Sequence, residues 1–173
     1  MREKLKREDG LTLVEMLAAV VILILLGLLL NTGLQMAVRT YRIITAQSEV
    51  ELLLSTAMDA LIDDLRYARD VSGSGTGFTY TSDSFGENTS LAINSDGQIV
   101  AKVGDDEKRF LATGTYGLNG AYRVAEMKIH SIVAADPDTE VTFTIELKVE
   151  TTDKTISAKT PDGGVTVRCL NPK

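Results

Sequence analysis

A continuous apolar segment near the amino end constrains the fold of this chain more than any other feature. Leu11 to Leu30 is 20 residues long, and only Thr12 and Glu15 within it are polar. As an α-helix the segment extends roughly 30 Å, which matches the hydrocarbon core of a bilayer. A helix also satisfies its own backbone hydrogen bonds in lipid. The sequence therefore predicts a membrane-spanning helix, which we place at residues 11–34.

Basic residues on the two sides of this segment predict its orientation. Four of them lie in the leader, residues 1–10, and the next ones along the chain are Arg39 and Arg42. An excess of Lys and Arg favours the cytoplasmic side, and acidic residues count little in this rule. We therefore expect a single-pass membrane protein with a cytoplasmic amino end and an exported carboxyl end.

The apolar segment differs from a cleaved secretory signal, which has a shorter apolar core followed by a small-residue cleavage site. An uncleaved signal anchor is the stronger alternative, but it leaves Glu15 unexplained. An ionised carboxylate costs about 2.5–3.5 kcal/mol at the centre of a membrane helix. Glu15 is only about one turn from the start of the segment, so it either reaches the interface or has a partner.

The residues around Glu15 resemble the type IV prepilin signal. Gly10–Leu17, GLTLVEML, has the glycine, the apolar residue and the Thr-Leu-Val-Glu run that precede an apolar helix in that family. The resemblance implies cleavage between Gly10 and Leu11 by prepilin peptidase, on the cytoplasmic side, and methylation of the new amino terminus at Leu11. Phe is commoner than Leu at that position, so Leu11 is a departure from the family pattern.

The same resemblance implies a role for the carboxylate of Glu15. In the family this acid is thought to pair with the amino terminus of a neighbouring subunit and to fix the stagger between subunits. A buried charge used for register has physical precedent. The predicted assembly residues are Glu15 and Thr12, and the Thr12 hydroxyl also suits a helix start, where it can accept a hydrogen bond from a nearby backbone N–H.

An amphipathic pattern follows the apolar segment. The apolar positions recur at spacings of three and four: Leu54, Met58, Leu61, Leu65 and Ala68. The pattern predicts that one helix runs from Leu11 to about Val71, with residues 35–71 as its amphipathic outer half. The stretches Arg39–Arg42 and Ala60–Ala68 also resemble the PilW- and GspJ-like branch of minor pilins and pseudopilins.

The remaining sequence predicts strands. Residues 72–77, SGSGTG, suit a linker, and residues 78–173 suit a β-sheet domain. An Asp-Gly turn separates Ser90–Ile93 from Gln98–Val103, a longer strand is expected at Tyr122–Ala134, and Val141–Val149 alternates with period two. Another turn separates Thr155–Lys159 from Val165–Leu170. The predicted fold class is α+β, with the long helix packed against one antiparallel sheet, and the resemblance implies the type IV pilin fold.

No residue set in the sequence points to catalysis. The net charge of −6 disfavours nucleic-acid binding, which needs a basic surface. His130 and Cys169 are each the single residue of their type, so we expect a structural or surface histidine and a small buried cysteine. The acidic clusters at residues 105–107 and 136–140 lack the spacing of a calcium loop and suit solvated turns. We expect no enzyme activity, no cofactor and no bound metal.

Together these features predict a minor pilin or pseudopilin subunit that moves from the membrane into a cell-surface filament. The expected partners are other pilin subunits, prepilin peptidase, the inner-membrane assembly machinery and the lipid bilayer. A type IV pilus, a type II secretion pseudopilus and a competence filament for DNA uptake all fit the sequence. The alternative from another class is an extracellular ligand-binding module that uses the helix only as a membrane tether.

Overall fold

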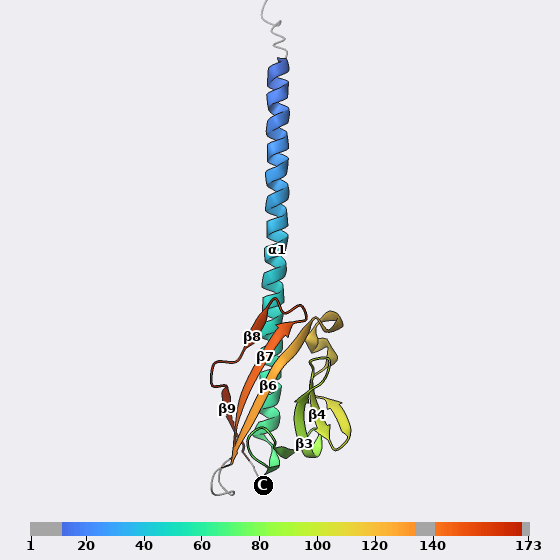
Figure 1. The fold of residues 1–173 in the computed structure, drawn as a ribbon, viewed down its shortest axis with the longest axis vertical. Helices are drawn as coiled ribbons and strands as arrows, with labels where there is room; N and C mark the ends of the chain where they lie inside the picture. The colour runs from blue at the N-terminus through green and yellow to red at the C-terminus, as the bar shows by residue number, and fades with distance from the viewer. Residues whose placement is uncertain (1–11, 134–140, 171–173) are drawn as a thin grey trace, which may run out of the picture. The chain divides into compact units, whose positions relative to one another are not determined.

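The computed structural model describes residues 12–133 and 141–170. It begins with one helix, α1 (Leu13–Arg66), drawn from blue to green in Figure 1. The chain divides into two units, residues 1–43 and 44–173, which we describe separately. All described residues of the first unit belong to α1 except Thr12, and all of their side chains are exposed.

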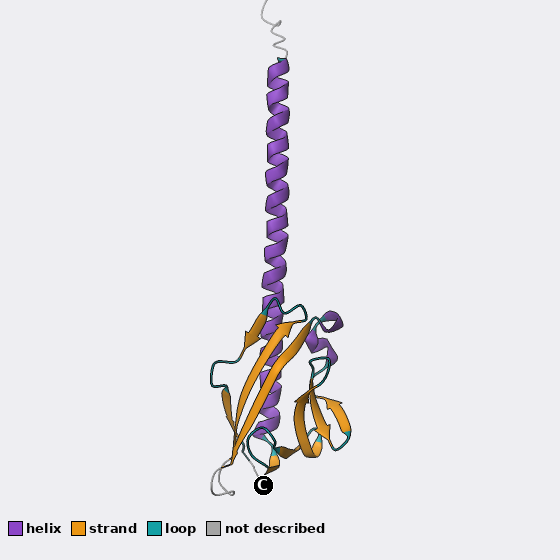
Figure 2. Ribbon diagram, in the orientation of Figure 1, coloured by secondary structure: helices purple, strands orange, loops and turns teal. Residues whose placement is uncertain are grey.

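Two antiparallel sheets make up most of the second unit (Figure 2). The first has the order β1-β2-β3-β4-β5, with β1 (Arg69–Ser72), β2 (Thr79–Ser82), β3 (Gly86–Ile93), β4 (Ile99–Val103) and β5 (Asp106–Arg109). The second contains β6 (Tyr122–Val133), β7 (Val141–Thr151), β8 (Ser157–Lys159) and β9 (Val165–Arg168), where β6, β8 and β9 all pair with β7. Two short 3-10 helices, η1 (Thr113–Tyr116) and η2 (Leu118–Gly120), precede β6.

The α+β layout of a long amino-terminal helix followed by antiparallel strands is confirmed. Strand β7 is the clearest case, because its side chains alternate between buried and half-buried from Val141 to Lys148, as the period-two pattern predicts. The predicted hairpin is also present, since β3 and β4 pair in register from Thr89–Val103 to Ile93–Ile99.

The Asp-Gly turn of this hairpin requires its glycine. Asn94 accepts hydrogen bonds at its side-chain oxygen from the backbone N–H groups of Asp96 (3.0 Å) and Gln98 (2.9 Å). Gly97 has a φ of +72°, and a Cβ there would lie 2.6 Å from Cβ of Arg123 on β6. The Gly97 carbonyl accepts from the Val124 N–H at 2.8 Å, so the turn also joins the two sheets.

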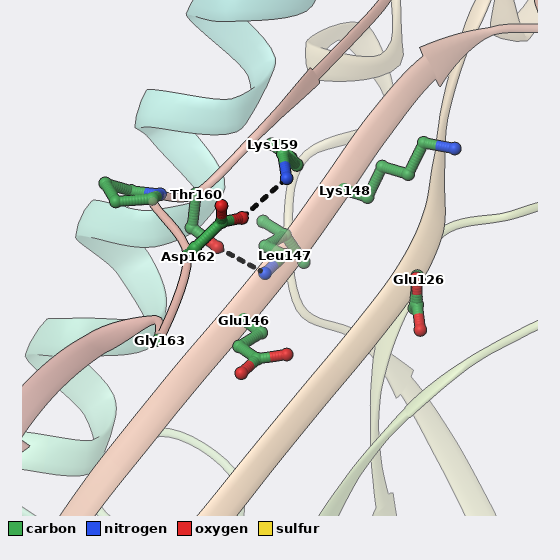
Figure 3. A pocket seen from close by; sticks show the side chains of 9 residues that line it. Glu126, Glu146, Leu147, Lys148, Lys159, Thr160, Asp162 and Gly163 are labelled. Carbon is green, nitrogen blue, oxygen red and sulfur yellow. Dashed lines mark hydrogen bonds and ion pairs between the residues drawn. The ribbon is translucent and has the colours of Figure 1, made fainter.

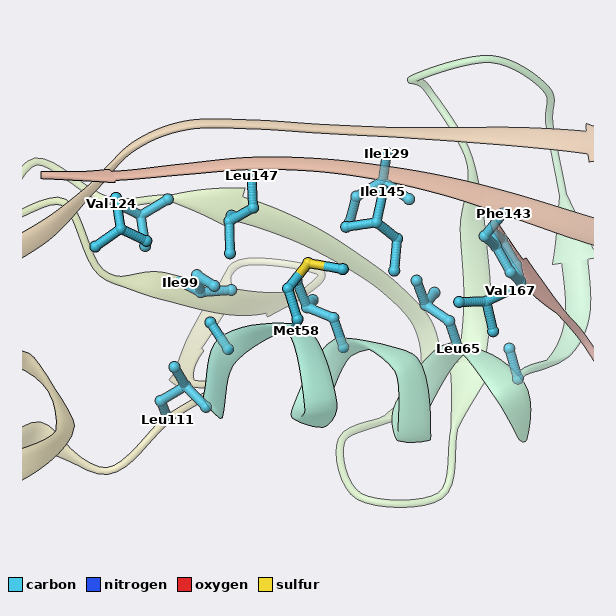
Figure 4. Close-up of a cluster of buried hydrophobic side chains, with 14 of the residues drawn as sticks. Met58, Leu65, Ile99, Leu111, Val124, Ile129, Phe143, Ile145, Leu147 and Val167 are labelled. Carbon is cyan, nitrogen blue, oxygen red and sulfur yellow. The ribbon is translucent and has the colours of Figure 1, made fainter. Parts of the chain in front are cut away.

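The outer part of α1 supplies one wall of the hydrophobic core. Its buried residues are Val50, Leu53, Ala57, Met58, Leu61 and Leu65. They pack in one cluster with strand residues such as Phe143, Ile145 and Leu147, as Figure 4 shows for part of the cluster. The predicted amphipathic stripe is therefore confirmed around Leu61. Burial begins at Val50, so no residue from 35 to 49 is buried although the amphipathic half was predicted from residue 35, and Leu54 is only half-buried.

Two boundaries differ from the sequence-based prediction. Helix α1 ends at Arg66 rather than near Val71, and Arg69–Ser72 forms β1. The carboxyl-terminal segment explains this early end, because the Leu170 N–H donates to the Arg66 carbonyl at 2.8 Å and the Cys169 Sγ donates to the Ala68 carbonyl at 2.9 Å. These distant residues satisfy carbonyls that a longer helix would use internally.

Two further predictions differ from the structure: the flexible linker at residues 72–77 and the single antiparallel sheet. Residues 72–77 are not simply a flexible connection, because Gly75 forms an antiparallel bridge with Ser131 of β6. The strands also separate into two sheets instead of one. The first sheet pairs consecutive strands from β1 to β5, and the second begins at β6 after the two 3-10 helices, a division that the strand patterns alone do not predict.

Candidate functional site

The candidate site lies at the amino-terminal start of α1. The predicted processing residues, Gly10 and Leu11, lie outside the described residues. The predicted assembly residues, Thr12 and Glu15, are described, and both are exposed. The geometry of the site is therefore that of Thr12, Glu15 and the helix that they begin.

Thr12 and Glu15 form a reciprocal cap on the first turn of α1. The Thr12 backbone N–H and hydroxyl both donate to Oε2 of Glu15, at 2.9 and 3.0 Å. In return the Glu15 backbone N–H donates to the Thr12 hydroxyl at 3.3 Å, and the Met16 N–H donates to the Thr12 carbonyl at 3.1 Å. This is a capping box, in which Thr12 is the N-cap and Glu15 is the third helical residue.

The capping box gives Glu15 a local function that the sequence analysis did not assign to it. The signal was present in the sequence, because Thr-x-x-Glu before an apolar run is the usual pattern of a capping box. The predicted role of the Thr12 hydroxyl as a helix-start acceptor is confirmed. Only Oε2 of Glu15 takes part, and no described residue donates a hydrogen bond to Oε1.

Exposed apolar side chains make up most of the rest of the first unit. Leu13, Leu23 and Leu30 are 82%, 66% and 74% exposed, and the helix is long and apolar enough to cross a membrane. The few polar groups near its middle are satisfied within the helix. The Thr32 hydroxyl donates to the Leu28 carbonyl at 2.9 Å, and the Gln35 amide donates to Asn31 at 3.2 Å.

A part-buried polar contact in the second unit holds α1 against β2. The Tyr80 hydroxyl donates to one oxygen of Asp64 at 2.5 Å, and the Ser82 hydroxyl donates to the other at 2.6 Å. Tyr80 is 1% exposed. Burial and the adjacent Asp64 carboxylate raise the pKa of the Tyr80 hydroxyl well above its usual value, so it stays protonated and remains a donor.

A second polar contact joins β6 to β7. Arg123 donates to Oε1 of Glu150 from Nη2 at 2.6 Å and from Nε at 3.1 Å, and Lys148 lies 3.7 Å from Oε2. The hydrogen bonds from Arg123 hold the pKa of Glu150 below its ordinary value, against the opposing effect of burial. Both polar contacts join neighbouring elements of the second unit.

A hollow on the second sheet gathers several charged residues, most of which have ion-pair partners beside them. It lies over β6, β7 and the segment after β8 and includes Glu126, Glu146, Lys148, Lys159 and Asp162 (Figure 3). Lys159 donates to Asp162 at 2.6 Å, and the Leu147 N–H donates to the Thr160 hydroxyl at 3.2 Å. Glu126 pairs with Lys128 and Lys148 with Glu150, so these charges are engaged with separate neighbours along the surface.

His130 and Cys169 lie where the sequence predicts. His130 is exposed on β6, and Cys169 is buried, with its Sγ directed at the Ala68 carbonyl. Across residues 12–133 and 141–170, no three His, Cys, Asp or Glu side chains are grouped so that they could hold a metal ion.

The chain matches no protein-family model, no curated protein and no solved structure in the comparisons with known proteins.

Proposed function

We propose that this chain is a prepilin of the minor pilin or pseudopilin type. In this proposal prepilin peptidase cuts it after Gly10 and methylates Leu11, and the apolar half of α1 (Leu13–Arg66) then enters the core of a filament. The protein is a structural subunit and not an enzyme. Its globular unit corresponds to the sheet domain of the type IV pilin fold.

The observation that carries the proposal is the position of Glu15 within the GLTLVE sequence. Glu15 lies in the first turn of an exposed apolar helix and uses one carboxylate oxygen for its own helix cap. The other oxygen accepts from no described residue. An α-ammonium group at Leu11 of a second subunit could therefore pair with Oε1 while the capping box stays intact.

The energetics favour such a pair only away from water. Two opposite charges attract weakly in solvent and strongly in a low dielectric, although desolvation offsets much of the gain. A filament core built from exposed side chains such as Leu17, Leu23 and Leu26 would exclude water. The pair would then fix which axial offset between subunits is allowed.

The alternative function is a membrane tether for a ligand-binding globular unit. The capping box favours it, because it explains Thr12 and Glu15 by helix stability alone. The two functions differ in what happens to the leader. A tether keeps residues 1–10, whereas a prepilin loses them.

The proposal is tested by co-expressing the full chain with a prepilin peptidase and determining its amino-terminal residue by mass spectrometry. We expect a product that begins with N-methylated Leu11. Gly10→Ala is the matched variant, and we expect it to slow or block the cut. An intact leader in the unaltered chain, with active peptidase shown on a known substrate, would overturn the prepilin function and leave the tether.

A further inference from the structure

A short basic and aromatic stretch follows the apolar part of α1. Arg39, Tyr41 and Arg42 are all exposed, and Tyr41 is 72% exposed. We call these three residues the collar. The collar arginines are the only basic residues between Leu13 and Leu65, and they lie in the first unit.

The helix segment between Glu15 and the collar has no charged side chain, and its hydrogen-bonding side chains have partners within the helix. From Met16 to Val38 the sequence has no charged residue. Thr32 donates to the Leu28 carbonyl, and Asn31 accepts from Gln35, so these side chains have partners within the helix. Exposed apolar residues continue between them to Leu34, Met36 and Val38. The collar is therefore the first part of α1 after Glu15 that needs an external polar partner.

No described residue supplies that partner. Neither collar arginine forms a hydrogen bond or an ion pair within the described chain. The next acids along α1 are already engaged, because Glu51 accepts from Gln47 at 3.2 Å and Glu49 accepts from Tyr122. Exposed guanidinium groups without carboxylate partners are suited to bind phosphate groups, which they contact in a bidentate manner.

The length of the helix places the collar at a membrane surface. From Leu13 to Arg39 is 26 residues, which is about 39 Å along a helix. A bilayer with its headgroups is about 40–45 Å thick. With Leu13 at the inner edge of a hydrocarbon core of about 30 Å, the Cα of Arg39 lies about 9 Å beyond the opposite edge, just outside a headgroup layer of about 5–8 Å. Helical side chains lean toward the amino end, so both arginine stems point back into that layer.

The charge of the second unit opposes contact with an anionic membrane, so the collar arginines are the residues nearest the membrane that favour it. Residues 44–173 contain 20 acidic and 12 basic residues, so this unit is repelled by a negatively charged surface. A guanidinium group close to such a surface is attracted to it. Tyrosine also prefers the interface between lipid and water. The collar thus combines the two residue types that anchor a helix at headgroup depth.

We propose that Arg39, Tyr41 and Arg42 bind anionic phospholipid headgroups on the exported side of the membrane and fix the depth of α1 in the bilayer. This inference requires that α1 spans a membrane. It does not depend on cleavage after Gly10, so it stands or fails separately from the prepilin function.

The absence of tryptophan from the chain allows a direct test. Tyr41→Trp places a single reporter in the collar of the full-length protein. The variant is reconstituted in vesicles of phosphatidylcholine alone or with phosphatidylglycerol, and its emission and quenching by brominated lipids are measured. We expect a blue shift and stronger quenching with phosphatidylglycerol. Both effects should disappear at 1 M salt, where the screening length is about 3 Å.

Matched variants separate the collar from general charge effects. Arg39→Gln/Arg42→Gln in the Tyr41→Trp background should lose the response to phosphatidylglycerol, whereas Arg66→Gln/Lys154→Gln, which removes the same charge elsewhere, should keep it. Leu23→Trp should be quenched in both vesicle types, which verifies insertion. The inference is overturned if lipid charge has no effect, if the collar variant still responds, if Leu23→Trp is not quenched, or if the response follows protein density, which would indicate contact with a second copy.

Discussion

At the residue scale, Glu15 combines two properties that substitution can separate. It accepts hydrogen bonds that cap α1, and it carries a negative charge next to an exposed apolar surface. Glutamine can replace glutamate in a capping box but has no charge. Valine has neither property. The pair of variants therefore distinguishes a role in helix capping from a role in charge pairing.

For Glu15→Gln and Glu15→Val, we expect normal cleavage after Gly10 and loss of incorporation into filaments. Removing one partner of a buried ion pair costs about 3–5 kcal/mol, so incorporation should fall by about a hundredfold or more. The measurement is the ratio of filament-bound to membrane-bound protein by immunoblot of sheared filaments. Normal incorporation of Glu15→Gln with a defect only in Glu15→Val would assign Glu15 to capping alone.

Asp64 is the second residue whose role is testable by itself. Asp64→Ala leaves the hydroxyl of the buried Tyr80 without its acceptor. An unsatisfied buried group costs about 1–3 kcal/mol, so we expect the free energy of unfolding in urea to fall by that amount. Asp64→Ala/Tyr80→Phe removes both partners and should recover part of the loss. Equal stability of the single variant and the unaltered protein would show that water replaces Asp64.

Glu150 makes stability depend on pH. Its pKa in the folded protein lies below the ordinary value of 4.5 because Arg123 donates to it. Its contribution is therefore complete well above pH 4.5 and is lost as pH falls through the lower folded pKa. We expect Glu150→Gln to be less stable than the unaltered protein by about 1.5–3 kcal/mol at pH 7. The difference should shrink toward pH 2 in urea titrations, and a difference independent of pH would contradict this assignment.

The sequence singled out Thr12 and Glu15 as candidate assembly residues, but it did not predict their mutual hydrogen bonds. Thr12 and Glu15 are three residues apart, which is a local relation that the sequence contains. By contrast, Asp64 meets Tyr80 and Ser82 only because α1 packs on β2, and no local pattern predicts that contact. Residues that act through tertiary contacts are therefore the ones that sequence reasoning misses.

At the element scale, hydrophobic period was a reliable guide to the interior of elements and a poor guide to their ends. The alternation from Val141 to Val149 predicted β7 because one face of that strand packs on the core. The end of α1 at Arg66 depends instead on hydrogen bonds from Cys169 and Leu170. Those residues are about a hundred positions away in the sequence, so their influence is not visible in the helix itself.

Between Val50 and Leu65, α1 has leucines on its buried face and on its exposed face, so the effect of the same substitution on stability can be compared between them. Leu61 is 0% exposed in the core, and Leu52 on the same helix is 66% exposed. We expect Leu61→Ala to lower the free energy of unfolding by about 2–5 kcal/mol because it leaves a cavity. Leu52→Ala should change it by less than about 0.5 kcal/mol. Both are measured by urea unfolding monitored by circular dichroism.

The reverse order of these two effects would show that the outer half of α1 packs differently from the structure. A large effect of both substitutions would show that Leu52 is also covered, for example by a second copy of the chain. Repeating the measurement at several protein concentrations separates these outcomes, because a covering copy makes stability depend on concentration.

At the scale of the whole molecule, exposed apolar residues and acidic residues occupy different parts of the sequence. The described residues of the first unit are all exposed and mostly apolar, whereas every residue of the hydrophobic core lies at Val50 or later. Acidic residues likewise concentrate after residue 48. The first unit therefore leaves a long apolar surface that no described residue covers, and the second has a hydrophobic core of its own.

The second unit should fold without the first. We expect a fragment of residues 44–173 to be soluble and monomeric in sedimentation, and to unfold cooperatively in urea with about 5–15 kcal/mol, the usual stability of a domain. A fragment of residues 59–173 is the matched control, because it lacks Val50, Leu53, Ala57 and Met58 of the core. It should expose strand side chains that α1 covers, bind a hydrophobic dye and lose the cooperative transition. Equal behaviour of the two fragments would mean that the sheets hold together without the helix. A molten longer fragment would mean instead that residues before Ile44 contribute to the fold.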